Sequence, residues 1–308
     1  MDDDSTHDLD PVADLLDVLD LTEVGARRID VSGAHATDTT TARVFVGRSQ
    51  PMPHGRVFGG QVLAQCLIAA GRTVDAGSER QVHSMHGYFL RPGDSQESIQ
   101  FSVENMRDGR SFSARRVHAM QEGRILLSMI TSFQDPAGGL DHQDEMPAAP
   151  DPESLPPDAT LLASFDDARA RTFAQRRAID LRHVDGQIWS RPAESRDPAQ
   201  RVWLRADGQL PDDPLVHAAV LAYASDYSLL ESILRRHGIA WSDPRLRPAS
   251  LDHAMWFHRP ARADDWVLYA QNSPSAQSGR GLGVGRMFSR DGTLVATVGQ
   301  EGMVRIKE

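Results

Sequence analysis

The stretch SLDHAMWFHRP, residues Ser250–Pro260, has a counterpart far upstream in VHSMHGYFLRP, residues Val82–Pro92. Both are aromatic-rich runs of strand character that close on Arg-Pro, and the closing pair recurs 168 residues later. Two turns keep nearly the same spacing: Gly109-Arg110 with Gly279-Arg280, and Glu122-Gly123 with Asp291-Gly292. A nearly constant offset in three separate features indicates an internal duplication.

The composition is that of a folded protein with room for two domains. The chain has 308 residues, of which 40% are hydrophobic and 25% charged, so it can bury a sizeable core. Its net charge of −10 offers no basic surface, and we expect no nucleic-acid partner. No apolar run reaches the roughly 18 residues of a membrane span, and the acidic start MDDDSTHDLD is unlike a basic signal peptide. These features predict a cytoplasmic protein.

Cys66 is the only cysteine, which excludes an internal disulfide and a cysteine-based zinc site. It lies in VLAQCLIAA, on an apolar helix face, which favours an inert core thiol over a nucleophile. His253 and His258 are expected on opposite faces of their strand, as are His83 and His86, so neither pair can hold a metal. We therefore expect no metal and no other cofactor.

Helix and strand patterns occur twice in the same order. In the first half, a strand at 41–47 is followed by an apolar helix pattern at 59–74 and by strand-like runs at 82–90, 98–105, 112–120 and 124–134. In the second half, a strand at 201–206 precedes a long helix at 214–236 and runs at 250–258, 266–271, 282–289 and 294–299. One helix followed by a meander of long strands predicts an α+β fold, with an antiparallel sheet wrapped round a central helix in each repeat.

These patterns divide the chain into four parts. Residues 1–24 form an acidic N-terminal segment, disordered to about residue 10, with a short helix at 11–24. Residues 25–135 form the first repeat. Residues 136–195 form a linker with a helical insertion at 158–177, and residues 196–308 form the second repeat.

Asp226 stands out in the second central helix. Leu229 and Ile233 lie at helical spacing from it, so its carboxylate is expected to point with the apolar face toward the sheet. Burial raises the pKa of a carboxyl group, which suits a general base. Alternatively, the helix kinks near Ser225, and Asp226 caps the following turn. The corresponding first-half residue, Ile68, is apolar, which favours a functional role for Asp226.

Three other features each have two interpretations. Ser250 can supply a hydroxyl to a site, but it is also typical of a solvated strand end. Gln300 follows three apolar residues on one face of the last strand, where its amide can orient a water or complete a ladder. Gly59 and Gly60 start the first central helix, where their backbone amides can stabilise an oxyanion or the glycines can serve a tight turn. Neither a dinucleotide-binding nor a serine-hydrolase motif is present.

Several ordered stretches together resemble the acyl-CoA thioesterase II family, whose members are double hot-dog proteins. The stretches are VFGGQVLAQ (57–65), VHSMHGYFLRPGD (82–94), RDGRSFSARRV (107–117), TSFQ (131–134), AYASD (222–226), LDHAMWFHRP (251–260) and QEGMVR (300–305). The resemblance implies a catalytic set of Asp226 from AYASD, Ser250 two residues before Asp252, and Gln300 from QEG. Ser250 stands where the usual form of the family has Thr, and the hydroxyl is retained.

The implied reaction is hydrolysis of medium- to long-chain fatty acyl-CoA to free fatty acid and CoA. Asp226 would deprotonate a water that Ser250 and Gln300 orient. The backbone amides of Gly59 and Gly60 are the candidates for receiving the oxyanion. The family also implies a homo-oligomer.

Val82 stands where the second repeat has Ser250, so we expect one active site per chain, in the second repeat. The histidines and aromatic residues of 250–260 are expected to serve sheet packing. Two alternatives remain open. A hot-dog acyl-thioester hydratase or dehydratase would need a His-Asp pair, and His217 lies nine residues before Asp226. A non-catalytic acyl-thioester-binding protein would need no intact catalytic set.

Overall fold

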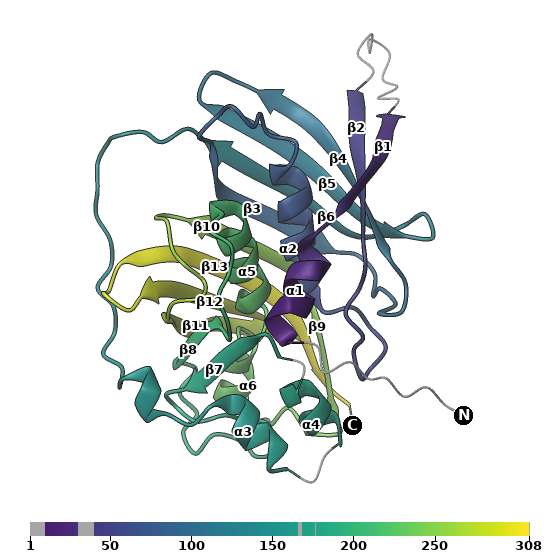
Figure 1. The fold of residues 1–308 in the computed structure, drawn as a ribbon. Helices are drawn as coiled ribbons and strands as arrows, with labels where there is room; N and C mark the ends of the chain where they lie inside the picture. Colours follow the sequence, from purple (N-terminus) through teal and green to yellow (C-terminus); the bar gives the residue numbers. More distant parts are fainter. Residues whose placement is uncertain (1–9, 30–39, 166–167, 176, 308) are drawn as a thin grey trace.

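The computed structural model describes residues 10–29, 40–165, 168–175 and 177–307 (Figure 1). The disorder expected at the start of the chain concerns residues 1–9, which lie outside the described residues. The helices are α1 Pro11–Leu19, α2 Gly59–Gly71, α3 Asp158–Ala163, α4 Ala168–Gln175, α5 Pro214–Ser225 and α6 Glu231–His237. The strands are β1 Thr22–Ile29, β2 Thr40–Gly47, β3 Gln81–Phe89, β4 Ile99–Asp108, β5 Phe112–Gln121, β6 Arg124–Gln134, β7 Ile179–His183, β8 Gln200–Ala206, β9 Leu246–Ser250, β10 Asp252–Phe257, β11 Val267–Gln277, β12 Arg280–Ser289 and β13 Leu294–Ile306.

The strands form one antiparallel sheet. Read outward from its centre, the order of the strands is equivalent in the two directions. The order is β1-β2-β4-β5-β6-β3-β10-β13-β12-β11-β8-β7, with β9 paired to β13 off this path. At the centre β3 pairs with β10, and Met85 lies opposite Met255. The order outward from β3 is matched element by element by the order outward from β10, as a duplication requires. The predicted α+β class is confirmed. We propose that the repeats correspond to residues 25–135 and 196–308.

The prediction of a simple meander is wrong for β3 in the first repeat and for β10 in the second. β3 pairs with β6, and β10 pairs with β13, so each of these strands crosses to the far side of the three strands that follow it. The connection at residues 90–98 is much longer than the tight β4–β5 turn at residues 109–111, so it can make this crossing. The crossing brings β3 and β10 to the join between the repeats.

The two central helices lie side by side and antiparallel within the wrap of the sheet (Figure 1). The start of α2 meets the end of α5, because a Cβ atom added to Gly60 would lie 2.3 Å from the carbonyl oxygen of Tyr223. The end of α2 meets the start of α5, where a Cβ on Gly71 would lie 2.4 Å from the Leu215 side chain. Glycine is needed at both crossings, since any side chain would push the helices apart. The joint core is built around this pair.

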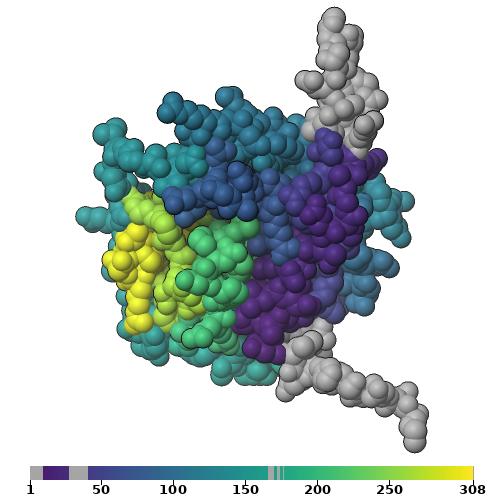
Figure 2. All heavy atoms as spheres, turned by 45° about the horizontal axis from the view of Figure 1, so that its top comes forward, coloured from purple at the N-terminus to yellow at the C-terminus, as the bar shows by residue number. Residues whose placement is uncertain are grey.

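The N-terminal helix α1 packs against both repeats. Figure 2 shows this segment, in purple, lying between the blue first repeat and the green part of the second. Its apolar face buries Val12, Leu15, Val18 and Leu19. The side chain of Gln65, in the middle of α2, donates a hydrogen bond of 2.9 Å to the Val18 carbonyl, so the helix is also tied to the core by a buried polar contact.

Several predicted boundaries are wrong. The long helix expected at 214–236 is broken, because α5 ends at Ser225, Asp226 is its C-cap residue, and α6 begins at Glu231. The kink proposed as an alternative is therefore present. The strand expected at 250–258 is interrupted at Leu251. The helical pattern at 158–177 forms two short helices, α3 and α4, and the edge strands β1 and β7 had no clear pattern.

Candidate active site

Asp226, Ser250 and Gln300 come together through one side-chain amide. Nε2 of Gln300 donates a hydrogen bond of 2.8 Å to Oδ1 of Asp226 and a second of 2.6 Å to Oγ of Ser250. Gln300 is only 1% exposed, so both N–H groups of its amide need partners, and these two residues supply them. The three residues, predicted from distant parts of the sequence, form one polar cluster.

The local structure explains how each side chain reaches the cluster. Ser250 ends β9, opposite Gly302 of β13, and Gln300 lies two residues back along the same strand. Asp226 enters from the other side because α5 ends there. A Cβ on Gly302 would lie 2.7 Å from the Leu230 side chain, so this glycine gives room to the turn that follows Asp226. The break in the predicted helix thus directs Asp226 toward Gln300.

The start of α2 provides a backbone partner for the same carboxylate. A Cβ on Gly59 would lie 2.6 Å from Oδ2 of Asp226, and the Gly60 backbone amide hydrogen-bonds the carboxyl group. The N-cap residue Phe58 offers no side-chain acceptor to this end of the helix. The free amides at the helix start favour a negative charge here. Gly59 and Gly60 of the first repeat therefore lie beside the predicted base of the second.

Burial raises the pKa of Asp226 to about 6, and three hydrogen bonds oppose the shift, from Gln300, the Gly60 amide and Ser250. The residue as a whole is only partly buried. A carboxyl group with a pKa near 6 is ionised at neutral pH and is a stronger base than an exposed aspartate. The cluster has the electrostatics of a general-base site.

Aromatic side chains form an apolar wall next to the cluster. The Phe58 ring lies 5.1 Å from the ring of Tyr223 and 4.8 Å from that of Tyr227, the residue after Asp226. Phe89 reaches to 3.1 Å from the position of a Cβ on Gly59. A site with one buried carboxylate and apolar surroundings suits a largely apolar substrate.

His253 is a site residue that sequence reasoning missed. It was assigned to sheet packing, on the face opposite Ser250, but the break at Leu251 lets both residues reach Gln300. Its side chain is fully buried, with Nδ1 at 3.1 Å from Oε1 of Gln300 and Nε2 at 2.9 Å from Oγ of Ser225. Burial lowers its pKa to about 4, against the opposing effect of the Gln300 bond. Its position three residues after Ser250 in the chain was the signal from which sequence reasoning could have identified it.

His258 and His86, on or next to the paired strands β3 and β10, make contacts outside this cluster. Nε2 of His258 lies 2.8 Å from Oγ1 of Thr297, and the ring of His86 packs on Trp256 at 5.0 Å. Within the described ranges, no group of three or more histidine, cysteine, aspartate or glutamate side chains is arranged to hold a metal ion.

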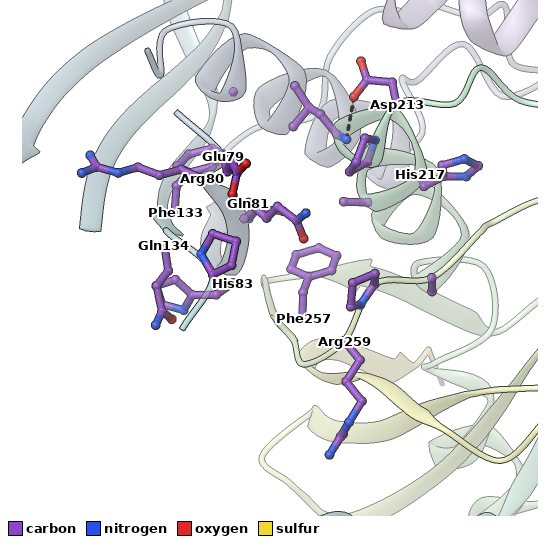
Figure 3. Close-up of a pocket in the computed structure, with 18 of the residues that line it drawn as sticks. Glu79, Arg80, Gln81, His83, Phe133, Gln134, Asp213, His217, Phe257 and Arg259 are labelled. Atoms are coloured by element: carbon purple, nitrogen blue, oxygen red, sulfur yellow. Dashed lines mark hydrogen bonds between the residues drawn. The ribbon is translucent and has the colours of Figure 1, made fainter. Parts of the chain in front are cut away.

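The opposite ends of the central helices border a separate, open pocket. A cavity of about 1090 Å³ lies between the end of α2 and the start of α5, and its lining includes Gly71, Leu215, His217 and Phe257 (Figure 3). None of Asp226, Ser250 and Gln300 lines it. Because the two repeats have the same order of elements, this pocket corresponds in position to the cluster of Asp226, Ser250 and Gln300.

First-repeat residues at the matching positions cannot form the same cluster. Thr131 stands at the position of Gln300, and its hydroxyl donates 3.0 Å to the Ser84 carbonyl. Thr131 pairs with Arg115 across β5 and β6, just as Gln300 pairs with Gly283 across β12 and β13. These first-repeat side chains are held in contacts of their own.

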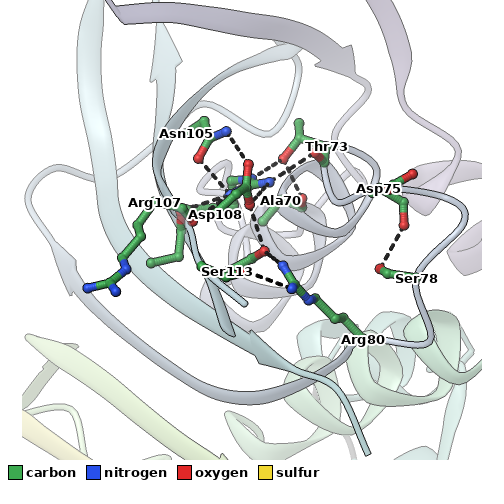
Figure 4. A network of polar contacts seen from close by, with 12 residues as sticks. Ala70, Thr73, Asp75, Ser78, Arg80, Asn105, Arg107, Asp108 and Ser113 are labelled. Carbon is green, nitrogen blue, oxygen red and sulfur yellow. Dashed lines mark hydrogen bonds and ion pairs between the residues drawn. The ribbon is translucent and has the colours of Figure 1, made fainter. Parts of the chain in front are cut away.

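Arg115 is the centre of a structural network in the first repeat. It is 1% exposed, and its guanidinium donates to Thr73 Oγ1 at 2.8 Å, to the Thr73 carbonyl at 3.1 Å and to Asn105 Oδ1 at 2.8 Å (Figure 4). It also forms an ion pair of 2.9 Å with Asp108. At the matching Gly283, a Cβ would lie 2.7 Å from the Leu229 carbonyl, so glycine lets the turn after Asp226 approach the sheet.

The fold and the cluster define a double hot-dog protein with a candidate hydrolytic site. Over 96% of this chain and 99% of the other, the structure is similar to an acyl-CoA thioesterase II from Mycobacterium marinum, with a TM-score of 0.73 and 41% identity. It is also similar to a hot-dog protein from Alicyclobacillus acidocaldarius, with a TM-score of 0.72, 18% identity, and 96% and 99% of the two chains covered. The predicted double hot-dog architecture is confirmed.

The chain belongs to the acyl-CoA thioesterase family. The family's own model, acyl-CoA thioesterase, matches residues 171–303, and the model of the acyl-CoA thioesterase N-terminal domain matches residues 48–134. The chain is 37% identical to acyl-CoA thioesterase 2 of Haemophilus influenzae, covering 86% of this chain and 93% of the relative. It is 36% identical to human acyl-coenzyme A thioesterase 8, covering 97% and 92%. The resemblance stated from the sequence is confirmed.

Proposed function

We propose that this protein hydrolyses medium- to long-chain fatty acyl-CoA to free fatty acid and CoA. The observation that carries the proposal is the side-chain amide of Gln300. It donates hydrogen bonds to both Asp226 and Ser250 beside the start of α2. Family membership supports the thioester substrate. The apolar wall of Phe58, Phe89 and Tyr227 supports an acyl chain of some length.

Asp226 acts as the general base in this reaction. Its carboxylate takes a proton from a water that Ser250 and Gln300 orient, and the water oxygen attacks the thioester carbonyl carbon. The tetrahedral intermediate then collapses with cleavage of the carbon–sulfur bond, and the departing thiolate takes the proton from Asp226. The products are the fatty acid and the free thiol of CoA, and no cofactor is consumed.

The amides of Gly59 and Gly60 stabilise the oxyanion of the intermediate. Backbone amides at a helix start are donors that need no reorganisation during the reaction. The Gly60 amide serves the Asp226 carboxylate in the resting site. Once Asp226 has taken the proton, its need for this donor falls, and the amide becomes free for the oxyanion.

The decisive measurement is thiol release from acyl-CoAs of increasing chain length. We expect wild-type protein to release CoA, with the largest kcat/KM on medium and long chains. Asp226→Asn should lose most of kcat, because an amide cannot accept the proton. Circular dichroism should show that the fold of this variant is intact. Asp252→Asn is the matched control, since the side-chain oxygen that accepts 2.7 Å from the Glu301 amide is retained.

The same assay separates the alternatives. An Asp226→Asn variant with wild-type turnover would exclude Asp226 as the base. Loss of water from an added 3-hydroxyacyl-CoA to give the enoyl-CoA, or the reverse addition of water, would favour a dehydratase or hydratase, although His253 contacts Ser225 and Gln300 rather than forming a pair with Asp226. Binding of acyl-CoA without release at any chain length would identify a non-catalytic binding protein.

We also propose a homo-oligomer, a dimer or larger. On the neighbouring strands β6, β3 and β10, the side chains of Ile130, Tyr88 and Trp256 are 43%, 64% and 39% exposed. Large apolar side chains gathered on one face are typical of a surface that pairs with another subunit. Light scattering on the purified protein measures the mass of the particle in solution. A monomer at all protein concentrations would refute the proposed homo-oligomer.

We propose that the protein works in the cytoplasm in fatty acid metabolism, because its proposed substrate is a CoA thioester, which is made and used inside cells. Fractionation of the source cells with an antibody against the chain tests the compartment. Separately, no helix in the described part of the chain is long and apolar enough to cross a membrane.

A further inference from the structure

The orientation of the Gln300 amide decides whether the site is assembled. An amide has two ends of almost the same shape, an oxygen that accepts and a nitrogen that donates. Only one orientation turns the nitrogen toward Asp226 and Ser250. In the reversed orientation, Oε1 would face the Asp226 carboxylate at hydrogen-bond distance, and two acceptors would repel each other. The other end of the amide, Oε1, is buried as well, so it needs a donor of its own.

His253 lies at that other end. Its Nδ1 is 3.1 Å from Oε1 of Gln300, and both side chains are buried away from water, so no solvent can replace the contact. We propose that His253 is a positioning residue, whose Nδ1–H group donates to Oε1 of Gln300 and thereby holds the amide nitrogen toward Asp226 and Ser250. This inference rests on the proposed function of the cluster.

The remaining contact of the imidazole is consistent with this proton position. Because burial lowers the pKa of His253 to about 4, the ring is neutral near pH 7 and carries one proton. With the proton on Nε2, the lone pair of Nδ1 would face the lone pairs of Oε1 at 3.1 Å. With the proton on Nδ1, Nε2 is an acceptor 2.9 Å from Oγ of Ser225, and the single hydroxyl proton of Ser225 turns to it from the Ala222 carbonyl, which lies 2.8 Å from the same oxygen. Ser225 is the last residue of α5 and directly precedes Asp226. The chain of contacts from Gln300 through His253 therefore ends beside the proposed base.

The test compares two amides at position 253. In His253→Asn, the side-chain nitrogen can occupy the place of Nδ1 and still donate to Gln300. In His253→Gln, the longer side chain carries its nitrogen toward the place of Nε2, near Ser225, and cannot reach Oε1 in the same way. His253→Leu removes both polar contacts. Each variant is assayed for kcat and KM on acyl-CoA and for its pH profile.

We expect His253→Leu and His253→Gln to lower kcat about tenfold or more, which corresponds to one lost hydrogen bond, with KM changed less than about twofold. His253→Asn should keep kcat within about threefold of wild type. The acid limb of kcat/KM should move to higher pH in the Leu and Gln variants, because the Gln300 bond lowers the pKa of Asp226.

A shift of the acid limb can be assigned to Asp226, because of the kinds of groups that face its carboxylate. Its charge acts on Tyr227 and Tyr269, and burial raises the pKa of both phenols, so neither titrates in the pH range of the assay. Gly60, Gln300 and Ser250 contribute hydrogen bonds only. A merely structural role for His253 would lower the amount of folded protein without moving the acid limb. Wild-type kcat in His253→Leu, or equal losses in the Asn and Gln variants, would overturn the proposal.

Nitrogen NMR of histidine-labelled wild-type protein gives a readout that depends on neither activity nor a variant. We expect the His253 signals to report the neutral ring with its proton on Nδ1. A proton on Nε2 in an active enzyme would overturn the inference while leaving the proposed function intact. An inactive wild-type protein with the proton on Nδ1 would refute the proposed function and leave only the orientation of the amide.

Discussion

Asp226 combines two properties that conflict in most aspartates. It is buried enough for its pKa to rise to about 6, yet it keeps three hydrogen-bond donors, from Gln300, Gly60 and Ser250. The first property makes it a better base, and the second keeps it ionised at neutral pH. The sequence predicted Asp226 on the apolar face of a continuous helix, but α5 ends at Ser225 and Asp226 is its C-cap residue. The donors could not be predicted, because they come from three other segments of the chain.

The raised pKa of Asp226 predicts an acid limb in the activity profile. Only the ionised carboxylate can take a proton from water, so kcat/KM should rise with pH through about 6 and level off above it. Steady-state rates on one acyl-CoA between pH 4 and 9 measure this. A limb near pH 4, the usual range of an exposed aspartate, would show that the carboxylate is not buried in the working enzyme.

Ser250 should matter less than Asp226. Ser250→Ala removes one hydroxyl that helps hold the water and the carboxylate, and we expect kcat to fall about tenfold rather than by several orders of magnitude. Ser250→Thr keeps the hydroxyl and should stay within about threefold of wild type. Kinetics of the two variants side by side check this, and equal losses in both would show that the volume at position 250 is important rather than the hydroxyl.

At the scale of elements, the ends of the two central helices create the site. The sequence placed the starts of both helices correctly and matched their VLA strings, at residues 62–64 and 220–222. It did not predict that the helices are antiparallel, or that the start of α2 reaches the end of α5. Those facts depend on the sheet order, which joins the two repeats edge to edge through β3 and β10. The break after Ser225 has the same origin, since the turn that follows packs under β12 and β13.

Gly60 should be sensitive to the smallest substitution. In Gly60→Ala the new Cβ would lie 2.3 Å from the Tyr223 carbonyl and push α2 away from α5, so we expect a loss of roughly 1–3 kcal/mol in the free energy of unfolding and a large loss of kcat. Gly299→Ala is the matched control, because nothing lies within 4 Å of its added Cβ. Urea unfolding and thiol release measure both. A stable, active Gly60→Ala protein would show that the helices can separate without harm.

At the scale of the whole molecule, the duplicated halves have diverged in chemistry while keeping one architecture. One pair of helix ends lies beside the cluster of Asp226, Ser250 and Gln300, and the other pair borders the large cavity. The difference was visible in the sequence as Ile68 and Val82 at the matching positions. It is reinforced in the structure by Arg115, whose partners lie in the loop after α2 and on the neighbouring strand β4.

Removal of Arg115 should separate stability from catalysis. Arg115→Ala removes a buried guanidinium and leaves partly buried partners such as the Thr73 carbonyl unsatisfied, and we expect a loss of roughly 2–3 kcal/mol in unfolding free energy with kcat per folded molecule unchanged. The neighbouring Arg116→Ala breaks only a 3.3 Å ion pair with Glu104 and should change stability by less than about 1 kcal/mol. Denaturation curves test both. A lower kcat in folded Arg115→Ala would indicate that the first repeat also acts on the catalytic cluster.

The sequence by itself determined the duplication, the α+β class, the family and the identity of Asp226, Ser250 and Gln300 as site candidates. These follow from periodicity and from motifs that are local in the chain. Only the tertiary structure decided that the helix ends at Asp226, that Gly60 donates to its carboxylate, and that His253 contacts Gln300 instead of serving sheet packing alone. The physical reason is that a hydrogen bond between residues such as His253 and Gln300, 47 positions apart, exists only once the sheet has set their strands in place.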